Sequence, residues 1–341
     1  PRPSEAEPDL SRNVSGLKAP AQAAMRLEAR KRRAAGEEVL DLAFDEPRLA
    51  MSRIIVEAAQ RAIHQGRVGS TPDSGLLELR VAIARHLSLL SGGRPVNADN
   101  VVISNGARQA LFEACFSLFG SSGEVLVPAP TWHSIPQAVR LSKAKPIRVA
   151  GDVEWSLKVG IDQLNRAATP DTAGVVFCSP VNPTGAVYTR AELKAIVEWA
   201  VERGCWVIAD EVNRRIHFGS GAAPSVLDLP DELLTRVVVV GGPSKTYGLS
   251  GWRLGFSLAP KSVARSMTTL QSHVTGGAAL PAQWACVAAY SDERVEADVK
   301  KRVEEIRSHR DLVVTHFRKH MPGIEFVDPL GGTHLFYRVD G

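Results

Sequence analysis

The sequence of 341 residues has only four cysteines, and their wide spacing excludes a metal-binding or redox-active cysteine pair. Three of them, Cys115, Cys178 and Cys205, lie inside apolar runs, which is typical of buried free thiols in a reducing compartment. No apolar run approaches the roughly 18 residues of a membrane-spanning helix, and no signal-peptide pattern opens the chain. These absences predict a cytoplasmic protein that has no membrane partner.

The sequence also has only a small excess of positive over negative charge. The chain has 41 Lys and Arg residues against 37 Asp and Glu residues, a formal net charge of +4. So small an excess predicts no nucleic-acid partner, because such proteins usually carry a clustered basic face. The densest basic run, residues 26–33, has helical composition and contains Glu28, so we interpret it as a solvated helix face.

Short apolar runs alternate with longer helical segments through most of the chain. Runs such as VVVV at 237–240 show no polar alternation, which indicates strands that are buried on both faces. Helical patterns such as 107–119 and 190–202 lie between the runs. This alternation predicts an α/β fold with a seven-stranded, mainly parallel sheet. The seven predicted strands begin near Val101, Glu124, Lys145, Gly174, Cys205, Arg236 and Arg253.

The length suggests about two domains, at roughly 150 residues each. We predict a large domain at 46–284 and a smaller α+β domain formed by 1–45 plus 285–341. The chain stops directly after a predicted strand, so we expect a truncated C-terminus, because a domain that ends in mid-sheet leaves an open edge. The segments expected in the smaller domain are a short strand at 38–44, a long amphipathic, charged helix or helix pair at 295–319 and strands at 324–327 and 333–339.

Ligands of doubly wound sheets bind at the carboxyl ends of the strands, and four such ends carry reactive or anion-binding residues. After the first strand, Gly106 and Ala107 open a helix and Arg108 adds a cation, which suits an anion. After the fourth strand comes Asn182, followed by Pro-Thr-Gly. Taken alone, each segment could equally be an ordinary turn.

The other two strand ends carry a carboxylate and an amine. Asp210 and Glu211 follow five apolar residues, where a carboxylate needs a partner; a structural salt bridge is the alternative reading. Lys245 follows a buried strand, where partial desolvation favours a neutral, nucleophilic amine. A surface lysine after a strand remains the alternative reading of that position.

Together these segments resemble one known family. Order and spacing are similar to those of the class I and II aminotransferases, which are pyridoxal-phosphate (PLP) enzymes of fold type I related to aspartate aminotransferase. The resemblance extends from about Glu38 to the end of the chain. The motifs that carry it are Asn182-Pro183-Thr184-Gly185, Asp210-Glu211, Ser244-Lys245, Gly251-Trp252-Arg253, Pro128-Ala129-Pro130-Thr131-Trp132 and Gly75-Leu76-Leu77-Glu78-Leu79-Arg80.

The resemblance implies a role for each residue. Lys245 would form an aldimine with PLP and move the proton on the substrate α-carbon, while Asp210 would keep the pyridine nitrogen protonated. Asn182 would hydrogen-bond the phenolic oxygen, and Trp132 would stack on the ring; both would also contact the substrate. Arg253 would bind the phosphate. The family is homodimeric with shared active sites, so a homodimer is expected. The remaining cofactor contacts would come from Gly106, Ala107, Arg108, Asn213 and Ser244.

Four departures from the family pattern concern the substrate and the cofactor. Asn213 stands where the family usually has a Tyr, and Ser70 stands where it has a Tyr that reaches the phosphate of the neighbouring subunit. Asp45 replaces a Gly beside the substrate carboxylate, so we expect it to repel a carboxylate and to attract a cationic substrate. The family's carboxylate-binding Arg would lie beyond the end of this chain.

The leading prediction is an enzyme that transfers an amino group from an amino acid to a 2-oxo acid. The departures keep a second prediction open: a cyclase, an elimination or replacement enzyme or an oxidase of the same fold, acting on a basic or activated amino acid. A PLP-binding sensor domain of a transcription regulator would need an N-terminal winged helix, for which the residues before the body are too few. No G-x-G-x-x-G follows a predicted strand, so a nicotinamide enzyme is set aside.

Overall fold

The computed structural model describes residues 11, 17, 21–40, 42, 49–121 and 123–339. By its internal contacts the chain divides into two units, residues 1–44 and 45–341, which we describe separately. The first unit contains helix α2 (Ala21–Ala34), which carries the basic run. On its surface the Arg32 Nε donates to the Glu28 Oε1 at 2.9 Å. The described part of the predicted strand at 38–44, residues 38–40 and 42, is not in a strand, so that prediction is wrong there.

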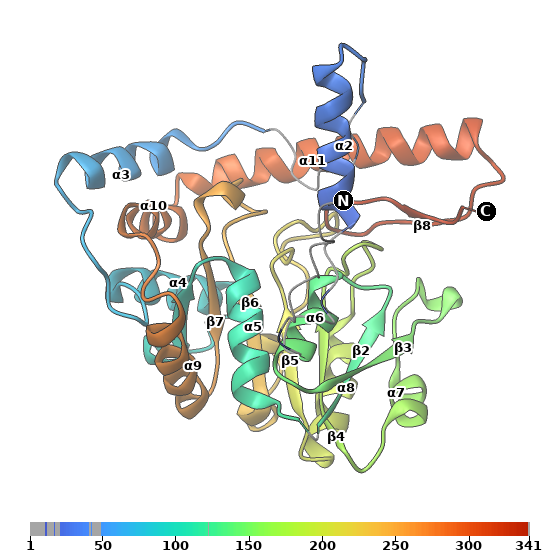
Figure 1. Ribbon diagram of the computed structural model, residues 1–341, viewed down its shortest axis with the longest axis horizontal. Coiled ribbons are helices and arrows are strands. Elements are labelled where there is room, and N and C mark those ends of the chain that lie inside the picture. Colours follow the sequence, from blue (N-terminus) through green and yellow to red (C-terminus); the bar gives the residue numbers. More distant parts are fainter. Residues whose placement is uncertain are drawn as a thin grey trace, which may run out of the picture. The chain divides into compact units, whose positions relative to one another are not determined.

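The second unit is built on a seven-stranded sheet in the order β1-β7-β6-β5-β4-β2-β3 (Figure 1). All seven predicted strands are present. Only β7 runs antiparallel to its neighbours β1 and β6, while the other pairs are parallel. The strands are β1 (Val101–Ser104), β2 (Glu124–Ala129), β3 (Lys145–Ala150), β4 (Thr172–Cys178), β5 (Trp206–Asp210), β6 (Val237–Gly241) and β7 (Gly255–Leu258).

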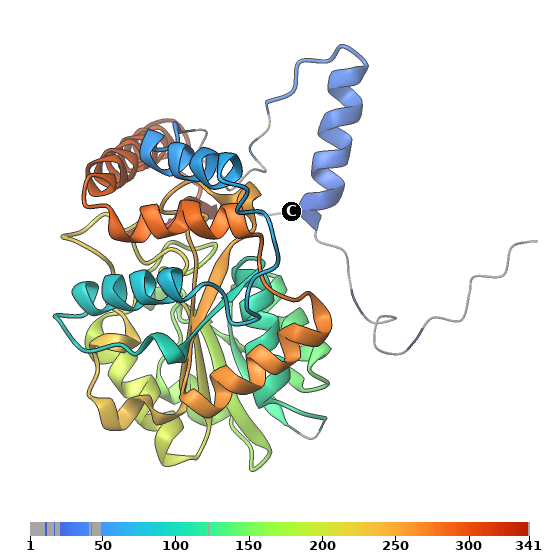
Figure 2. The same cartoon turned by 90° about the vertical axis from the view of Figure 1, so that its left-hand side faces the viewer.

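Helices lie on both sides of this sheet (Figure 2). The central strands β5 and β6 are buried almost along their whole length, which explains why their sequences are apolar without alternation. Helix α8 begins with a capping box between Thr189 and Glu192, as its sequence favours. The helices are α3 (Arg53–His64), α4 (Leu77–Leu90), α5 (Ala107–Leu118), α6 (Ser134–Leu141), α7 (Ile161–Ala167), α8 (Arg190–Glu202), α9 (Lys261–Val274), α10 (Leu280–Ser291) and α11 (Val295–His320).

The C-terminal segment matches its predicted pattern in outline. The helix expected at 295–319 is the single long helix α11, and it leads into the antiparallel pair β8 (Phe326–Val327) and β9 (Phe336–Tyr337). Both strands are shorter than predicted. No helix in the described part of the chain combines the length and the apolarity that crossing a bilayer requires.

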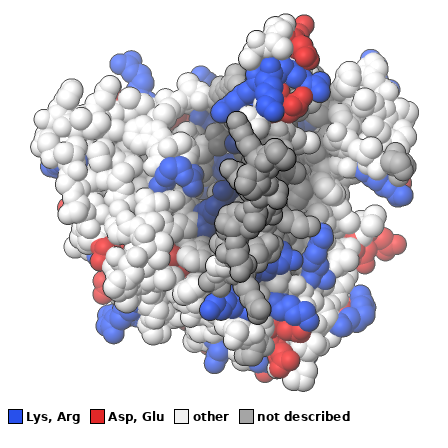
Figure 3. All heavy atoms as spheres, in the orientation of Figure 1, with Lys and Arg blue, Asp and Glu red and all other residues white. Residues whose placement is uncertain are grey.

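Charged side chains are mixed on the face that Figure 3 shows. Lys and Arg side chains are spread over this face, and Asp and Glu side chains lie among them. Many cations have an anion within reach: for example, the Lys145 Nζ lies 2.9 Å from the Glu124 Oε1, and the Lys158 Nζ lies 2.6 Å from the Glu192 Oε1. Such pairs agree with the small net charge of the sequence.

Candidate active site

The carboxyl end of β5 buries the predicted carboxylate. Asp210 is 8% exposed, and its Oδ1 accepts a hydrogen bond from the backbone N–H of Val212 at 3.1 Å. Burial raises the pKa of Asp210 to about 6, and the neighbouring charge of Glu211 adds to this rise. The Val212 N–H and the positive charge of Lys245 act in the opposite direction. Asp210 is therefore a buried carboxylate whose ionised form depends on nearby donors and cations.

The neighbouring carboxylate, Glu211, is occupied by structural contacts. Its two oxygens accept from the Ser225 hydroxyl at 2.8 and 2.7 Å, and its Oε1 also accepts from the Val226 N–H at 3.0 Å. The Arg214 Nε lies 3.9 Å from the Glu211 Oε2. Burial raises the pKa of Glu211, and the Arg214 charge opposes that rise. Of the two carboxylates that the sequence places side by side, Glu211 holds the loop and Asp210 is left for chemistry.

Lys245 lies in the loop that follows β6, the parallel neighbour of β5. Ser244 and Lys245 are both half-buried, and the loop is closed by a hydrogen bond from the Tyr247 N–H to the Pro243 carbonyl at 3.0 Å. The charge of Lys245 is close enough to act on the Asp210 carboxyl. The structure thus brings the predicted amine and the predicted carboxylate together at two adjacent strand ends.

Asn182 and Trp132 are connected through a residue that the sequence analysis had treated only as a buried thiol. Cys178, the last residue of β4, pairs in register with Asp210 of β5. The Asn182 N–H donates to the Cys178 Sγ at 3.3 Å, and Thr131, the residue before Trp132, also contacts this sulfur. The Thr131 Oγ1 lies 3.8 Å from the same atom. Its position at the end of a buried strand was the signal that could have marked Cys178.

The turn after β1 forms a cradle for an anion. Gly106 has a φ of +94° and begins α5, whose first turn has no side-chain cap among the described residues. A Cβ on Gly106 would collide with the guanidinium of Arg253, and a Cβ on Gly255 would collide with the backbone of Ala107. Arg108 lies with its guanidinium carbon 5.1 Å from the centroid of the Trp132 ring. Two arginines and an uncapped helix N-terminus thus surround this turn.

Of the three residues that depart from the family pattern, the structure describes two, and one of these is buried and the other exposed. Asn213 is buried, and its Oδ1 has no hydrogen-bond partner in the part of the chain that is described. Ser70 is exposed. Asp45 lies outside the described residues, so its predicted place beside the substrate is not addressed by the structure.

These residues fit PLP, the cofactor that the sequence predicts. The cradle at Gly106 with Arg253 suits a phosphate, and a buried carboxylate with a pKa of about 6 suits a protonated pyridine nitrogen. Lys245 supplies the amine that a carbonyl group requires. The buried and unpaired Oδ1 of Asn213 is the kind of polar atom that a bound molecule would satisfy.

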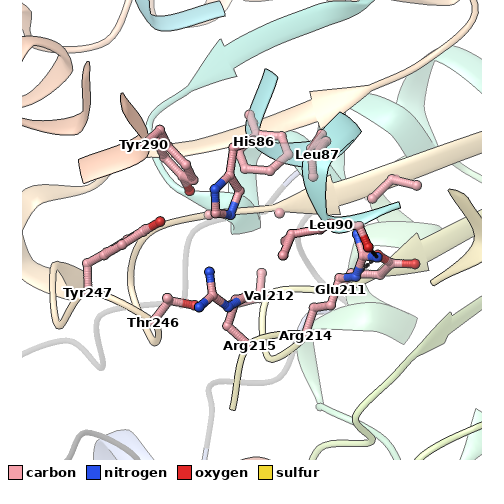
Figure 4. A pocket seen from close by; sticks show the side chains of 14 residues that line it. His86, Leu87, Leu90, Glu211, Val212, Arg214, Arg215, Thr246, Tyr247 and Tyr290 are labelled. Carbon is pink, nitrogen blue, oxygen red and sulfur yellow. Dashed lines mark hydrogen bonds and ion pairs between the residues drawn. The ribbon is translucent and has the colours of Figure 1, made fainter. Parts of the chain in front are cut away.

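A cavity of about 40 Å³ lies against the loops that carry Asn213 and Lys245 (Figure 4). Its walls include Arg214 and Arg215, which follow Asn213, and Tyr247, which closely follows Lys245. In Figure 4 the hydroxyl ends of Tyr247 and Tyr290 point into the same space. Both loops of the site therefore border the same cavity.

Comparison with known proteins agrees with this geometry. Residues 37–341 match the family described as aminotransferase class I and II. An aspartate aminotransferase of Streptomyces avermitilis is 34% identical over 331 residues, which cover 97% of this chain and 80% of the relative. A probable aspartate/prephenate aminotransferase of Rhizobium leguminosarum is 33% identical and covers 97% of this chain and 82% of the relative.

Solved structures show the same fold. The aspartate aminotransferase of Thermus thermophilus with maleate superimposes with a TM-score of 0.89 at 30% identity, and the match covers 95% of this chain and 84% of that one. The predicted fold, PLP fold type I with a seven-stranded and mainly parallel sheet, is confirmed. The predictions of an enzyme and of PLP as its cofactor are confirmed as well. The chain belongs to the class I and II aminotransferases.

Proposed function

We propose that this aminotransferase uses Lys245 to bind PLP and to move the substrate proton while an amino group passes from an amino acid to a 2-oxo acid. The observation that carries the proposal is the meeting of Lys245 and Asp210 at adjacent strand ends. The relatives described above are named for aspartate or for aspartate and prephenate, so aspartate is the proposed donor. They favour amino-group transfer, and nothing among them favours a cyclase, an elimination or replacement enzyme or an oxidase.

We propose that Asp210 stabilises the proton on the ring nitrogen of the bound cofactor. When it is bound, PLP draws electrons from the substrate α-carbon, provided that its ring nitrogen keeps a proton. With a pKa of about 6, the Asp210 carboxyl is mostly ionised at neutral pH. A buried carboxylate stabilises a proton on an adjacent nitrogen, because the opposite charge favours the protonated form. Asp210 therefore keeps the ring nitrogen protonated throughout the reaction.

The other residues orient the cofactor. Arg253 and the backbone at Gly106 hold the phosphate, where charge-assisted hydrogen bonds and the helix end act together. Trp132 stacks on the ring, and the guanidinium of Arg108, 5.1 Å from the Trp132 ring centroid, supports it. Asn182 donates to the phenolic oxygen. These contacts fix the reacting carbon near the amine of Lys245, which is how positioning lowers a barrier.

The test uses borohydride reduction together with an absorbance scan against a panel of amino acids. Wild-type protein is expected to trap PLP covalently and to form the pyridoxamine form with aspartate. Lys245→Ala is expected to lose the trapped adduct, whereas Lys261→Ala, at an exposed lysine 3.5 Å from Asp99, is expected to keep it. An adduct that survives in Lys245→Ala rules out this anchor. If no amino donor yields the pyridoxamine form, amino-group transfer is the wrong reaction.

The same panel tests Asp45, whose predicted attraction for cationic substrates stays part of the proposal. Arginine and lysine are included for this reason. If Asp45 acts on the substrate, Asp45→Gly should raise the rate with aspartate relative to the rate with arginine. An unchanged ratio of the two rates would remove Asp45 from the substrate site.

Assembly, location and domain division complete the proposal. We propose a homodimer with shared active sites, as the family resemblance implies, and sedimentation tests the dimer. We propose a cytoplasmic location, supported by four cysteines that are all buried and unpaired. We also propose a large domain at 46–284 and a smaller one from 1–45 plus 285–341. The seven-stranded sheet supports this division, although residue 284 lies inside α10.

A further inference from the structure

The Cys178 thiol lies where three parts of the candidate site meet. It ends β4 opposite Asp210, it accepts from the Asn182 N–H at 3.3 Å, and the residue before Trp132 lies against the same sulfur. The Thr131 Oγ1 is 3.8 Å away. Two of these segments come from different loops, 131–132 after β2 and 179–182 after β4, and no backbone hydrogen bond between them is found in the described chain.

The described backbone hydrogen bonds of each loop stay within that loop's own turn or lead to other segments. In the turn that contains Asn182, the Gly185 N–H donates to the Val181 carbonyl at 2.8 Å, so this bond lies within the turn itself. The Trp132 carbonyl accepts only within its own helical turn, from the Ile135 N–H at 3.0 Å. The second segment is tied to Asp210 directly, because the Ser179 N–H donates to the Asp210 carbonyl at 3.1 Å. The sulfur is the atom that both segments contact, through Thr131 and through the Asn182 N–H.

We propose that Cys178 is a positioning residue of the reaction: its thiol holds the Thr131–Trp132 segment and the backbone of Asn182 in one arrangement beside Asp210. This inference rests on the proposed roles of Trp132 and Asn182 toward the cofactor. Burial raises the pKa of Cys178 to about 12, with the Asp210 charge adding to the rise, so the group acts as a neutral thiol and not as a nucleophile.

The chemistry of sulfur suits this role. A buried thiol is a weak acceptor that accommodates polar neighbours at long range, and its cost of burial is small because it behaves as an apolar group. A displacement of about 1 Å at a group that orients a reacting molecule can lower a rate by about 100-fold. A loss of part of this positioning therefore shows in catalysis as well as in stability.

The test compares Cys178→Ala and Cys178→Ser with Cys115→Ala, a matched control. Cys115 is also fully buried but lies in the helical core of α5. All variants are studied as holoenzyme, by thermal unfolding, kcat, KM and the pH midpoint of the absorbance of the lysine-bound cofactor. Cys178→Ala is expected to lower kcat by about 10-fold or more and to shift the absorbance midpoint. Cys178→Ser, which keeps an acceptor, should recover part of both effects.

Two outcomes overturn the inference. In the first, Cys178→Ala loses stability as Cys115→Ala does, yet keeps the kcat and the absorbance midpoint of the wild type. In the second, Cys178→Ser is as impaired as Cys178→Ala. If Cys178→Ala does not fold, Cys178→Val, which fills the space without an acceptor, takes its place in both comparisons. A wild type that binds no PLP refutes the proposed function instead, so the two failures are distinguishable.

Discussion

The buried carboxyl of Glu113 gives a prediction whose magnitude follows from the structure. Glu113 lies in α5 with no exposed surface, its Oε1 accepts from the Gln109 Nε2 at 2.6 Å, and its Oε2 has no hydrogen-bond partner among the described residues. Burial raises the pKa of Glu113 from 4.5 to about 7. Between these two pH values the folded state holds a proton that the unfolded chain has already released, so this group costs stability as the pH rises.

Glu113→Gln removes this titration and leaves an oxygen for the hydrogen bond from Gln109. Linkage over the two pKa values gives about 2.5 kcal/mol between pH 5 and pH 8. The free energy of unfolding of the variant, relative to that of the wild type, should therefore rise by about 2.5 kcal/mol over this range. Since only the change with pH is used, the cost of the new amide cancels.

The assay is urea unfolding of both proteins at pH 5, 6, 7 and 8, at the same saturating PLP concentration. Glu198→Gln, at a half-exposed position on α8 beside Lys194, is the control and should run parallel to the wild type. If the Glu113→Gln and wild-type curves are also parallel, Glu113 ionises in the fold as readily as in the unfolded chain. The reasoning from burial would then be refuted.

Three further substitutions test the cradle, the site and the scaffold. Gly106→Ala should weaken PLP binding, measured by absorbance titration, because its Cβ would collide with Arg253; Gly204→Ala, also at positive φ but facing open space, should leave binding unchanged. Asn213→Tyr should shift the pH midpoint of the lysine-bound cofactor, since the new phenol can donate to the phenolic oxygen. Thr189→Ala removes the side-chain acceptor at the start of α8 and should lower the free energy of unfolding by about 1 kcal/mol in urea melts.

The sheet and the principal site residues could be predicted from local sequence. The central strands β5 and β6 are apolar runs whose burial on both faces leaves no polar alternation, while the edge strand β3 is more exposed and carries Lys145 and Arg148. Parallel strands also place their carboxyl ends at one edge, so Asp210 and Lys245 were expected to meet there before any contact was known. The short strand expected at 38–44 had a similar apolar composition, but its described residues form no ladder, because pairing depends on a neighbour that a sequence window does not contain.

The sequence by itself determined the fold class and the family, and it supplied the residues that we propose to hold the cofactor. The family resemblance already assigned the cofactor role to Asp210, but only the tertiary structure showed what Glu211 does, because its partners Ser225 and Arg214 reach it through the folding of a loop. Only the structure showed that Cys178 connects the segments of Trp132 and Asn182. Local sequence records how each segment folds, whereas hydrogen bonds between segments depend on distances that are set when the sheet brings its strand ends together.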